Sequence, residues 1–290
     1  MIHLSTGLRL GVDQAPLEQL AQTCRYLDIT TICSATQLDW TDKDVTRVRR
    51  FLDAQGLRIG EFSRFHHGLA SRDRAENDQA LAAYRQHLAH AGILGATCVG
   101  FSLTVLYSLD GSSSGEDPRS AAVWERAVAT IGELASAAEA AGMDIAAHPH
   151  QLGPLHSVEQ IERLQRDVNS PRLKVLLDPV NLVTLDTYHN TAPFLGHMFD
   201  ALGGDIVSVH AKDTALSGLQ RNDQGLLTVC RLDEAVPGKG NLDYATLLRR
   251  ANALDHDVVL NVEHLSKLDD KVVALHNIRH VAGEQGITLA

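Results

Sequence analysis

The chain has 290 residues and a formal net charge of −10, from 26 basic and 36 acidic side chains. A negative balance repels phosphate backbones, so we expect no nucleic-acid partner. No segment approaches the ~20 apolar residues that span a bilayer, and the N-terminus lacks the pattern of a signal peptide, so we expect no membrane association. Four scattered cysteines without a CxxC pair are typical of free thiols in a reducing compartment, which predicts a cytoplasmic protein.

Short β-rich runs alternate with amphipathic runs from one end of the chain to the other. The expected strands are Leu8–Val12, Ile29–Ser34, Leu57–Ser63, Ala96–Ser102, Asp144–His150, Leu173–Asp178, Ile206–Asp213 and Asp257–Glu263. The expected helices are Pro16–Leu27, Lys43–Gln55, Glu76–Leu94, Ser120–Ala141, Ser157–Val168, Thr191–Leu202, Leu242–Ala253 and Lys267–Gln285. Eight β/α units of this α/β pattern predict a single (β/α)₈ TIM-barrel domain over residues 1–290.

The connections that follow strands are longer than those that follow helices. The long ones are "RFHHGLASRDRA", "LTVLYSLDGSSSGEDPR" and the stretch from Thr214 to Asn241. Strand-to-helix loops of a TIM barrel all lie at one mouth, so we expect the functional site there. The segment "DGSSSGEDP" is either a flexible surface loop or a lid over a ligand.

Polar side chains end the four apolar strands five to eight. These are His148 and His150 in "AAHPH", Asp178 in "VLLDP", His210 in "VSVHAKD" and Glu263 in "VLNVEH". Singly, each fits a solvated or capped strand end, but a converging set needs a shared cation or a tight hydrogen-bond network. The nitrogen and oxygen ligands, without thiolate, favour Mn²⁺, Co²⁺, Fe²⁺ or Zn²⁺ over calcium cages and iron–sulfur clusters.

Four motifs occur in an order and spacing that resemble a known family. They are "LLDPVN", "VHAKD", "PGKGNLDYATLL" and "VVLNVEHL". With them, nearly the whole chain resembles the xylose-isomerase-like TIM-barrel superfamily of sugar phosphate isomerases and epimerases. The resemblance implies one divalent metal, often manganese, held by Glu, Asp, His and Glu on strands five to eight. The last three of these correspond to Asp178, His210 and Glu263.

Two positions depart from the family pattern. Strand five reads His-Pro-His at 148–150, where relatives often begin with Glu, so we assign His148 to the metal and His150 to substrate or catalysis. The register with His150 on the metal stays open. Asn181 stands where many relatives carry a substrate-binding His, and an amide carries no proton at neutral pH. These changes leave Glu263 as both a ligand and the one clear carboxylate base.

Further residues are expected around the substrate. Lys212 and Asp213 of "HAKD" are predicted to line the pocket. Lys212 either binds a hydroxyl, an enolate oxygen or a carboxylate, or serves as a structural ion-pair partner. The "RFHHG" segment offers His66 to the rim.

The residues and the resemblance together imply a metal-dependent sugar isomerase or epimerase. Glu263 would abstract a proton next to the carbonyl of a keto sugar or sugar acid, and the metal would stabilise the enediolate. The alternative is a metal-dependent lyase that eliminates a group from oxidised or 3-keto glycosides, because one base suffices for that reaction. Two further hypotheses are an endonuclease IV-like DNA repair enzyme and a non-catalytic sugar-binding protein. The negative net charge of the chain argues against the DNA repair enzyme. The expected partner is a small-molecule sugar or sugar derivative, and the number of subunits, a homo-oligomer included, is left open.

Overall fold

Eight parallel strands form the barrel in the computed structural model, which describes residues 1–103 and 116–290. They are β1 (Ile2–Thr6), β2 (Thr31–Ser34), β3 (Arg58–Ser63), β4 (Cys98–Ser102), β5 (Asp144–His148), β6 (Leu173–Leu177), β7 (Ile206–Ala211) and β10 (Val258–Val262). The hydrogen-bonded order is β1-β10-β7-β6-β5-β4-β3-β2. β1 and β2 stand at the two ends of this order, and a bridge between Gly7, just beyond β1, and Cys33 of β2 joins them. The barrel is therefore nearly closed, and the predicted fold is confirmed.

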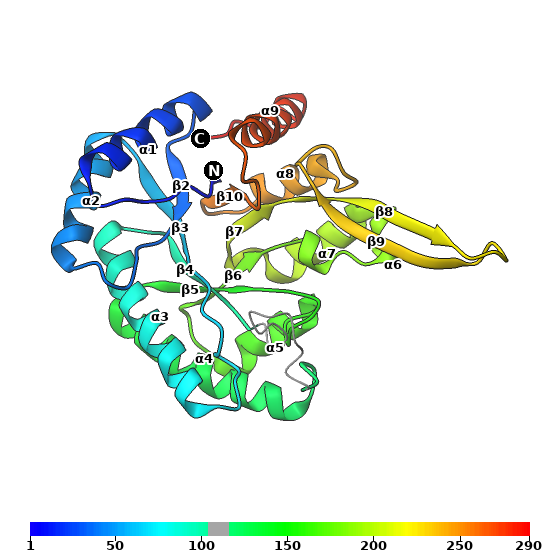
Figure 1. Ribbon diagram of the computed structural model, residues 1–290, viewed down its shortest axis with the longest axis horizontal. Coiled ribbons are helices and arrows are strands. Elements are labelled where there is room, and N and C mark those ends of the chain that lie inside the picture. The colour runs from blue at the N-terminus through cyan, green and yellow to red at the C-terminus, as the bar shows by residue number, and fades with distance from the viewer. Residues whose placement is uncertain (104–115) are drawn as a thin grey trace.

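Helices surround the strands on the outside (Figure 1). They are α1 (Gln14–Leu27), α2 (Asp42–Ala54), α3 (Arg74–Leu94), α4 (Ala121–Ala141), α5 (Val158–Val168), α6 (Leu185–Tyr188), α7 (Thr191–Leu202), α8 (Tyr244–Asn252) and α9 (Leu268–Glu284), with 3₁₀ turns η1 (Val180–Leu182) and η2 (Gly203–Asp205). Local signals set the ends: Thr41 and Asp44 form a capping box before α2, and Gly95 ends α3 in a left-handed conformation. Within the described residues, no helix has the length and apolar character needed to cross a membrane.

Side-chain alternation along the strands separates the core from the site. On β5, Ile145 and Ala147 belong to the large core between strands and helices, whereas Ala146 packs in a small cluster inside the barrel. The polar residues Glu61 and His210 are fully buried and contact one another, although they come from β3 and β7. The barrel therefore holds apolar residues on its outer face and a polar group of residues within.

The predicted first strand, Leu8–Val12, is wrong. The strand is Ile2–Thr6, in which all five residues are buried and pair in parallel with Val258–Val262. The run after it contains the exposed Arg9 and forms the loop that follows the strand. Ile2–Thr6 and Leu8–Val12 both have residues typical of strands. Which of them forms the strand depends on pairing with β10, some 250 residues away, and this pairing cannot be predicted from the local sequence.

The region after β7 also differs from the expected long connection. Residues from Thr214 to Asn241 contain most of an antiparallel hairpin of β8 (Asp213–Arg221) and β9 (Leu227–Ala235), which projects away from the barrel (Figure 1). Its turn is closed by a hydrogen bond from the Gly225 N–H to the Asn222 carbonyl. The other long segment, "DGSSSGEDP", falls largely in 104–115, outside the described residues, as does most of the connection that contains it.

Asp213 organises the loop that leads to α8. Its Oδ1 accepts hydrogen bonds from the backbone N–H groups of Thr214 and Leu242 at 2.8 and 2.9 Å. Its Oδ2 accepts from those of Gly238 and Gly240 at 2.9 and 2.8 Å. A Cβ atom at Gly240 would lie 2.3 Å from Oδ1, so this approach requires glycine. The buried carboxylate therefore holds two distant parts of the chain together.

Asp213→Ala is expected to lower the free energy of unfolding by about 2–4 kcal/mol, because four backbone N–H groups, two of them in buried hydrogen bonds, would lose their acceptor. Urea denaturation followed by circular dichroism measures the loss. Asp233→Ala, which removes a half-exposed carboxylate from the hairpin, is the control and is expected to change stability by less than about 0.5 kcal/mol. Equal losses in both variants would contradict this role of Asp213.

Candidate metal centre

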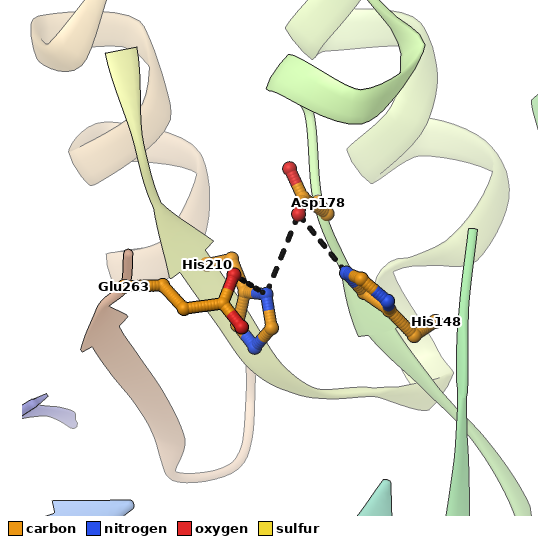
Figure 2. A group of neighbouring side chains, drawn as sticks. All are labelled: His148, Asp178, His210 and Glu263. Atoms are coloured by element: carbon orange, nitrogen blue, oxygen red, sulfur yellow. Dashed lines mark hydrogen bonds and ion pairs between the residues drawn. The ribbon is translucent and has the colours of Figure 1, made fainter. Parts of the chain in front are cut away.

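The four predicted ligands converge at the carboxyl ends of the strands (Figure 2). His148 ends β5, Asp178 directly follows β6, His210 lies in β7 and Glu263 directly follows β10. One nitrogen or oxygen atom from each lies within 4.8 Å of all the others. His148 Nε2 lies 3.0 Å from Asp178 Oδ2, and His210 Nδ1 lies 2.9 Å from Glu263 Oε2. The parallel barrel thus brings together residues that are up to 115 positions apart, from 148 to 263.

This donor set fits one divalent cation. Nitrogen and oxygen ligands bind such ions at ~2.0–2.2 Å, so two ligands on opposite sides of an ion are about 4.4 Å apart. The observed limit of 4.8 Å requires only a small inward shift. Glu263 Oε2 is buried and accepts no hydrogen bond of good geometry, although two nitrogen atoms lie 2.9 Å away. An acceptor in this situation is suited to a cation.

Lys212 places an ammonium group against the same oxygens. Its side chain is 2% exposed, and Nζ lies 2.9 Å from both Asp178 Oδ2 and Glu263 Oε2. Burial lowers the pKa of this amine, but the two carboxylates raise it more strongly, so the group stays charged. The structure thus shows Lys212 as an ion-pair partner. A cation binding these oxygens would require the ammonium to move aside.

The charges around the cluster favour ionised carboxylates. Burial raises the pKa of Asp178, but Lys212 and His148 lower it well below its usual value. Burial likewise raises the pKa of Glu263, whereas His210 and Lys212 lower it. Burial lowers the pKa of His210, and the neighbouring Glu263 and Glu61 raise it well above normal. At neutral pH the two carboxylates therefore have the charge that a cation needs.

Asn181 and His150 lie beside the cluster. Asn181 Oδ1 accepts from Lys212 Nζ at 3.3 Å, and its Nδ2 lies 3.2 Å from His148 Nε2. His150 comes after the end of β5, so the predicted strand was two residues too long and strand alternation does not aim its side chain. Its Nδ1 accepts a hydrogen bond from the Leu152 N–H at 3.1 Å. Burial is the main cause that lowers the pKa of His150, and the nearby His148 lowers it further. His148, and not His150, belongs to the group of four side chains whose candidate ligand atoms converge.

Two predicted substrate contacts face other parts of the protein. His66 Nε2 lies 2.8 Å from His87 Nε2 of α3, and its backbone N–H donates to the Tyr84 hydroxyl. Asp213 is directed at the loop before α8, as described above. Their substrate roles stay predictions. Phe65, the neighbour of His66, instead stacks on the His148 ring with centroids 5.1 Å apart.

Glu61 of β3 is a member of the group that sequence reasoning missed. Its carboxylate is fully buried, and its two oxygens lie 3.1 and 3.2 Å from His210 Nε2. A signal was present in "RIGEFS", because an acidic residue inside an apolar strand is as unusual as His148 or Asp178 at a strand end.

A cleft of about 720 Å³ opens beside Glu263, a volume in the range of small-molecule sites. Its lining comes from the ends of β2, β3 and β10 and from the segments after these strands and β1, and it includes Arg9, Phe65, Asn261 and His264. His264 has a left-handed backbone with φ of 58°, which is uncommon for a residue with a side chain and is often found at functional sites. The cluster therefore has an adjoining space for a ligand.

Comparisons with known proteins agree with this architecture. A D-tagatose 3-epimerase-like protein aligns with a TM-score of 0.71 at 16% identity, covering 98% of each chain. A xylose isomerase-like TIM barrel protein from Mycobacterium smegmatis, in complex with magnesium, aligns with a TM-score of 0.69 at 18% identity, covering 98% of this chain and 97% of that one. The 3-keto-D-glucoside 4-epimerase from E. coli aligns with a TM-score of 0.70 at 12% identity, covering 97% and 100%.

At these identities the structural likeness establishes the fold. No curated protein matched the sequence. The family model described as Xylose isomerase-like TIM barrel matches residues 21–281. The chain belongs to the xylose isomerase-like TIM barrel family.

Proposed function

We propose that this protein is a divalent-metal-dependent sugar isomerase or epimerase. The observation that carries the proposal is the convergence of His148, Asp178, His210 and Glu263 beside a cleft of sugar size. The names of two structural neighbours, a D-tagatose 3-epimerase-like protein and a 3-keto-D-glucoside 4-epimerase, support a sugar substrate. A third neighbour was solved with magnesium, which supports a divalent cation; we favour Mn²⁺, with Co²⁺, Fe²⁺ and Zn²⁺ as alternatives.

The chain's own residues supply the acid–base chemistry. Glu263 lines the cleft and its carboxylate is ionised, so it is available to take a proton from the carbon next to a carbonyl. His210 and Lys212 lower its pKa and with it its basicity, so proton abstraction would require the Lys212 ammonium to move away from this carboxylate. A divalent cation bound by the four ligands would polarise the substrate's oxygen atoms. Lys212 is a donor near the same position and would hydrogen-bond a hydroxyl or enolate oxygen once displaced from the carboxylates. His150 is proposed to orient substrate or transfer the second proton.

One observation favours elimination as a second candidate function. His148 is the β5 member of the cluster, so the carboxylates among the four ligands are Asp178 and Glu263. An imidazole bound to a metal is a poor second base, whereas elimination needs only one base to form the enediolate before a leaving group departs. A metal-dependent lyase acting on oxidised or 3-keto glycosides would therefore use the same Glu263.

A screen of keto sugars and 3-keto glycosides with Mn²⁺ in D₂O, followed by NMR, tests the proposal. Deuterium beside the carbonyl in recovered substrate or its isomer supports an isomerase or epimerase. Release of water or an aglycone supports a lyase. Binding of metal and sugar without solvent exchange or product would instead identify a sugar-binding protein.

Removal of the metal is expected to abolish turnover, because the cation is needed to stabilise charge on the substrate oxygens. The measurement is activity after dialysis against a chelator, and then after adding back Mn²⁺, Co²⁺ or Fe²⁺ separately. At least one ion should restore activity. Full turnover by a sample shown by elemental analysis to be free of metal would contradict the proposal.

The two histidines of "HPH" are expected to respond differently to substitution. His148→Ala should lower metal occupancy, because it removes a ligand atom, while His150→Ala should retain the metal and lose roughly 10²–10⁴-fold in turnover. Metal content and kcat of the two purified variants decide the matter. Normal occupancy in His148→Ala together with metal loss in His150→Ala would assign the metal to His150 instead.

Glu263→Gln is expected to be the most damaging single change in the cluster, because it weakens a ligand and removes the proposed base. The measurement is solvent-deuterium exchange into substrate at a Mn²⁺ concentration that saturates the variant, which separates the two losses. Exchange should remain at least about 10²-fold slower than in the unaltered protein. Full recovery at high Mn²⁺ would leave Glu263 a ligand only.

A further inference from the structure

His210 lies between two sets of carboxylates, one at each ring nitrogen. Nδ1 faces the cluster, 2.9 Å from Glu263 Oε2 and 3.4 Å from Asp178 Oδ2. Nε2 faces away from it, 3.1 and 3.2 Å from the two oxygens of Glu61. Because the imidazole separates Glu61 from the other two acids, this third carboxylate reaches the cluster through the ring.

Glu61 is fixed from several sides within the barrel. Ser63 Oγ donates to Oε1 at 2.5 Å, Ser208 Oγ donates to Oε2 at 2.6 Å and Cys33 Sγ donates to Oε1 at 3.5 Å. The side chain is fully buried, and it is not among the residues that line the cleft beside Glu263. Its position therefore gives it no direct contact with a substrate in that cleft.

We propose that Glu61 is a positioning residue that fixes the His210 tautomer with hydrogen on Nε2, leaving the Nδ1 lone pair for the divalent cation. The inference rests on the proposed metal function. An ionised carboxylate only accepts hydrogen bonds, so the ring nitrogen facing it carries a hydrogen. The surrounding carboxylates favour the protonated ring in the absence of metal, and a divalent cation binding at Nδ1 would displace the hydrogen there. The bound imidazole is then neutral, and its one N–H is the one on Nε2 that faces Glu61.

The orientation of Glu61 strengthens this assignment. Both oxygens lie within 3.2 Å of Nε2, so an amide in the same place would put an N–H group as well as a carbonyl beside the ring. Glu61→Gln consequently keeps the shape of the side chain but removes its charge and adds a competing N–H group, so it weakens the preference for a hydrogen on Nε2. The competing tautomer carries hydrogen on Nδ1 and cannot bind a metal there.

Calorimetric titration of metal-free protein with Zn²⁺ or Mn²⁺ tests the proposal without using activity. Glu61→Gln is expected to weaken binding by roughly 10–100-fold, the usual effect of losing the partner of a metal-binding histidine. Asp144→Asn is the matched control, because it removes a carboxylate at the opposite end of β5 that pairs with Arg172. The control is expected to bind metal within twofold of the unaltered protein.

The tautomer itself gives a second readout. With Zn²⁺ bound, ¹⁵N NMR of the histidine side chains should show hydrogen on Nε2 of His210 in the unaltered protein and loss of that signature in Glu61→Gln. Equal metal affinity or an unchanged tautomer in the variant would overturn the positioning role. Ser208→Ala is the second variant if Glu61→Gln does not fold. It removes a hydroxyl that donates to Glu61, so it should weaken metal binding several-fold. Unchanged metal affinity in this variant would overturn the positioning role. Absence of binding by the unaltered protein would instead refute the metal function, and the inference with it.

Discussion

The mouth of this barrel is organised by three carboxylates around His210, those of the buried Glu61 and Asp178 and of the partly buried Glu263. Glu61, Asp178 and Glu263 all lie within 3.4 Å of its ring nitrogens, and Lys212 contacts two of them. Removing an ionised carboxylate from water costs several kcal/mol unless opposite charge and hydrogen bonds replace the lost solvation. Cationic groups are therefore required there: Lys212 supplies one in this structure, and the proposed divalent ion would contact all four converging side chains together.

The parallel barrel provides the apolar packing that offsets the cost of burying these charges, and it holds their side chains rigidly. The outer faces of strands such as β5 are apolar and belong to the large core between strands and helices. The ligands stand in or directly after β5, β6, β7 and β10, where backbone hydrogen bonds limit their movement. The strand ends and the loops beyond them line the cleft, and loops of this kind can vary without disturbing the strands that hold the cluster.

Much of this organisation was predictable from the sequence because it follows local pattern. Seven of the eight barrel strands were placed within a few residues, and the four ligands were recognised as polar groups ending apolar runs. The first strand was misplaced since its identity depends on pairing with β10, and the hairpin after β7 was taken for a loop. Glu61 has a local signal, an acidic residue inside an apolar strand, but its contact with His210, 149 residues away, arises only when the barrel forms.

The central claim, that His148, Asp178, His210 and Glu263 hold one divalent cation, is tested most directly by anomalous X-ray diffraction from crystals soaked in Mn²⁺. The account predicts one strong manganese peak about 2.0–2.2 Å from a nitrogen or oxygen atom of each residue, with His210 bound through Nδ1 and the Lys212 ammonium displaced from Asp178 and Glu263. A cluster without a peak, with Lys212 still between the two carboxylates at saturating Mn²⁺, would contradict it.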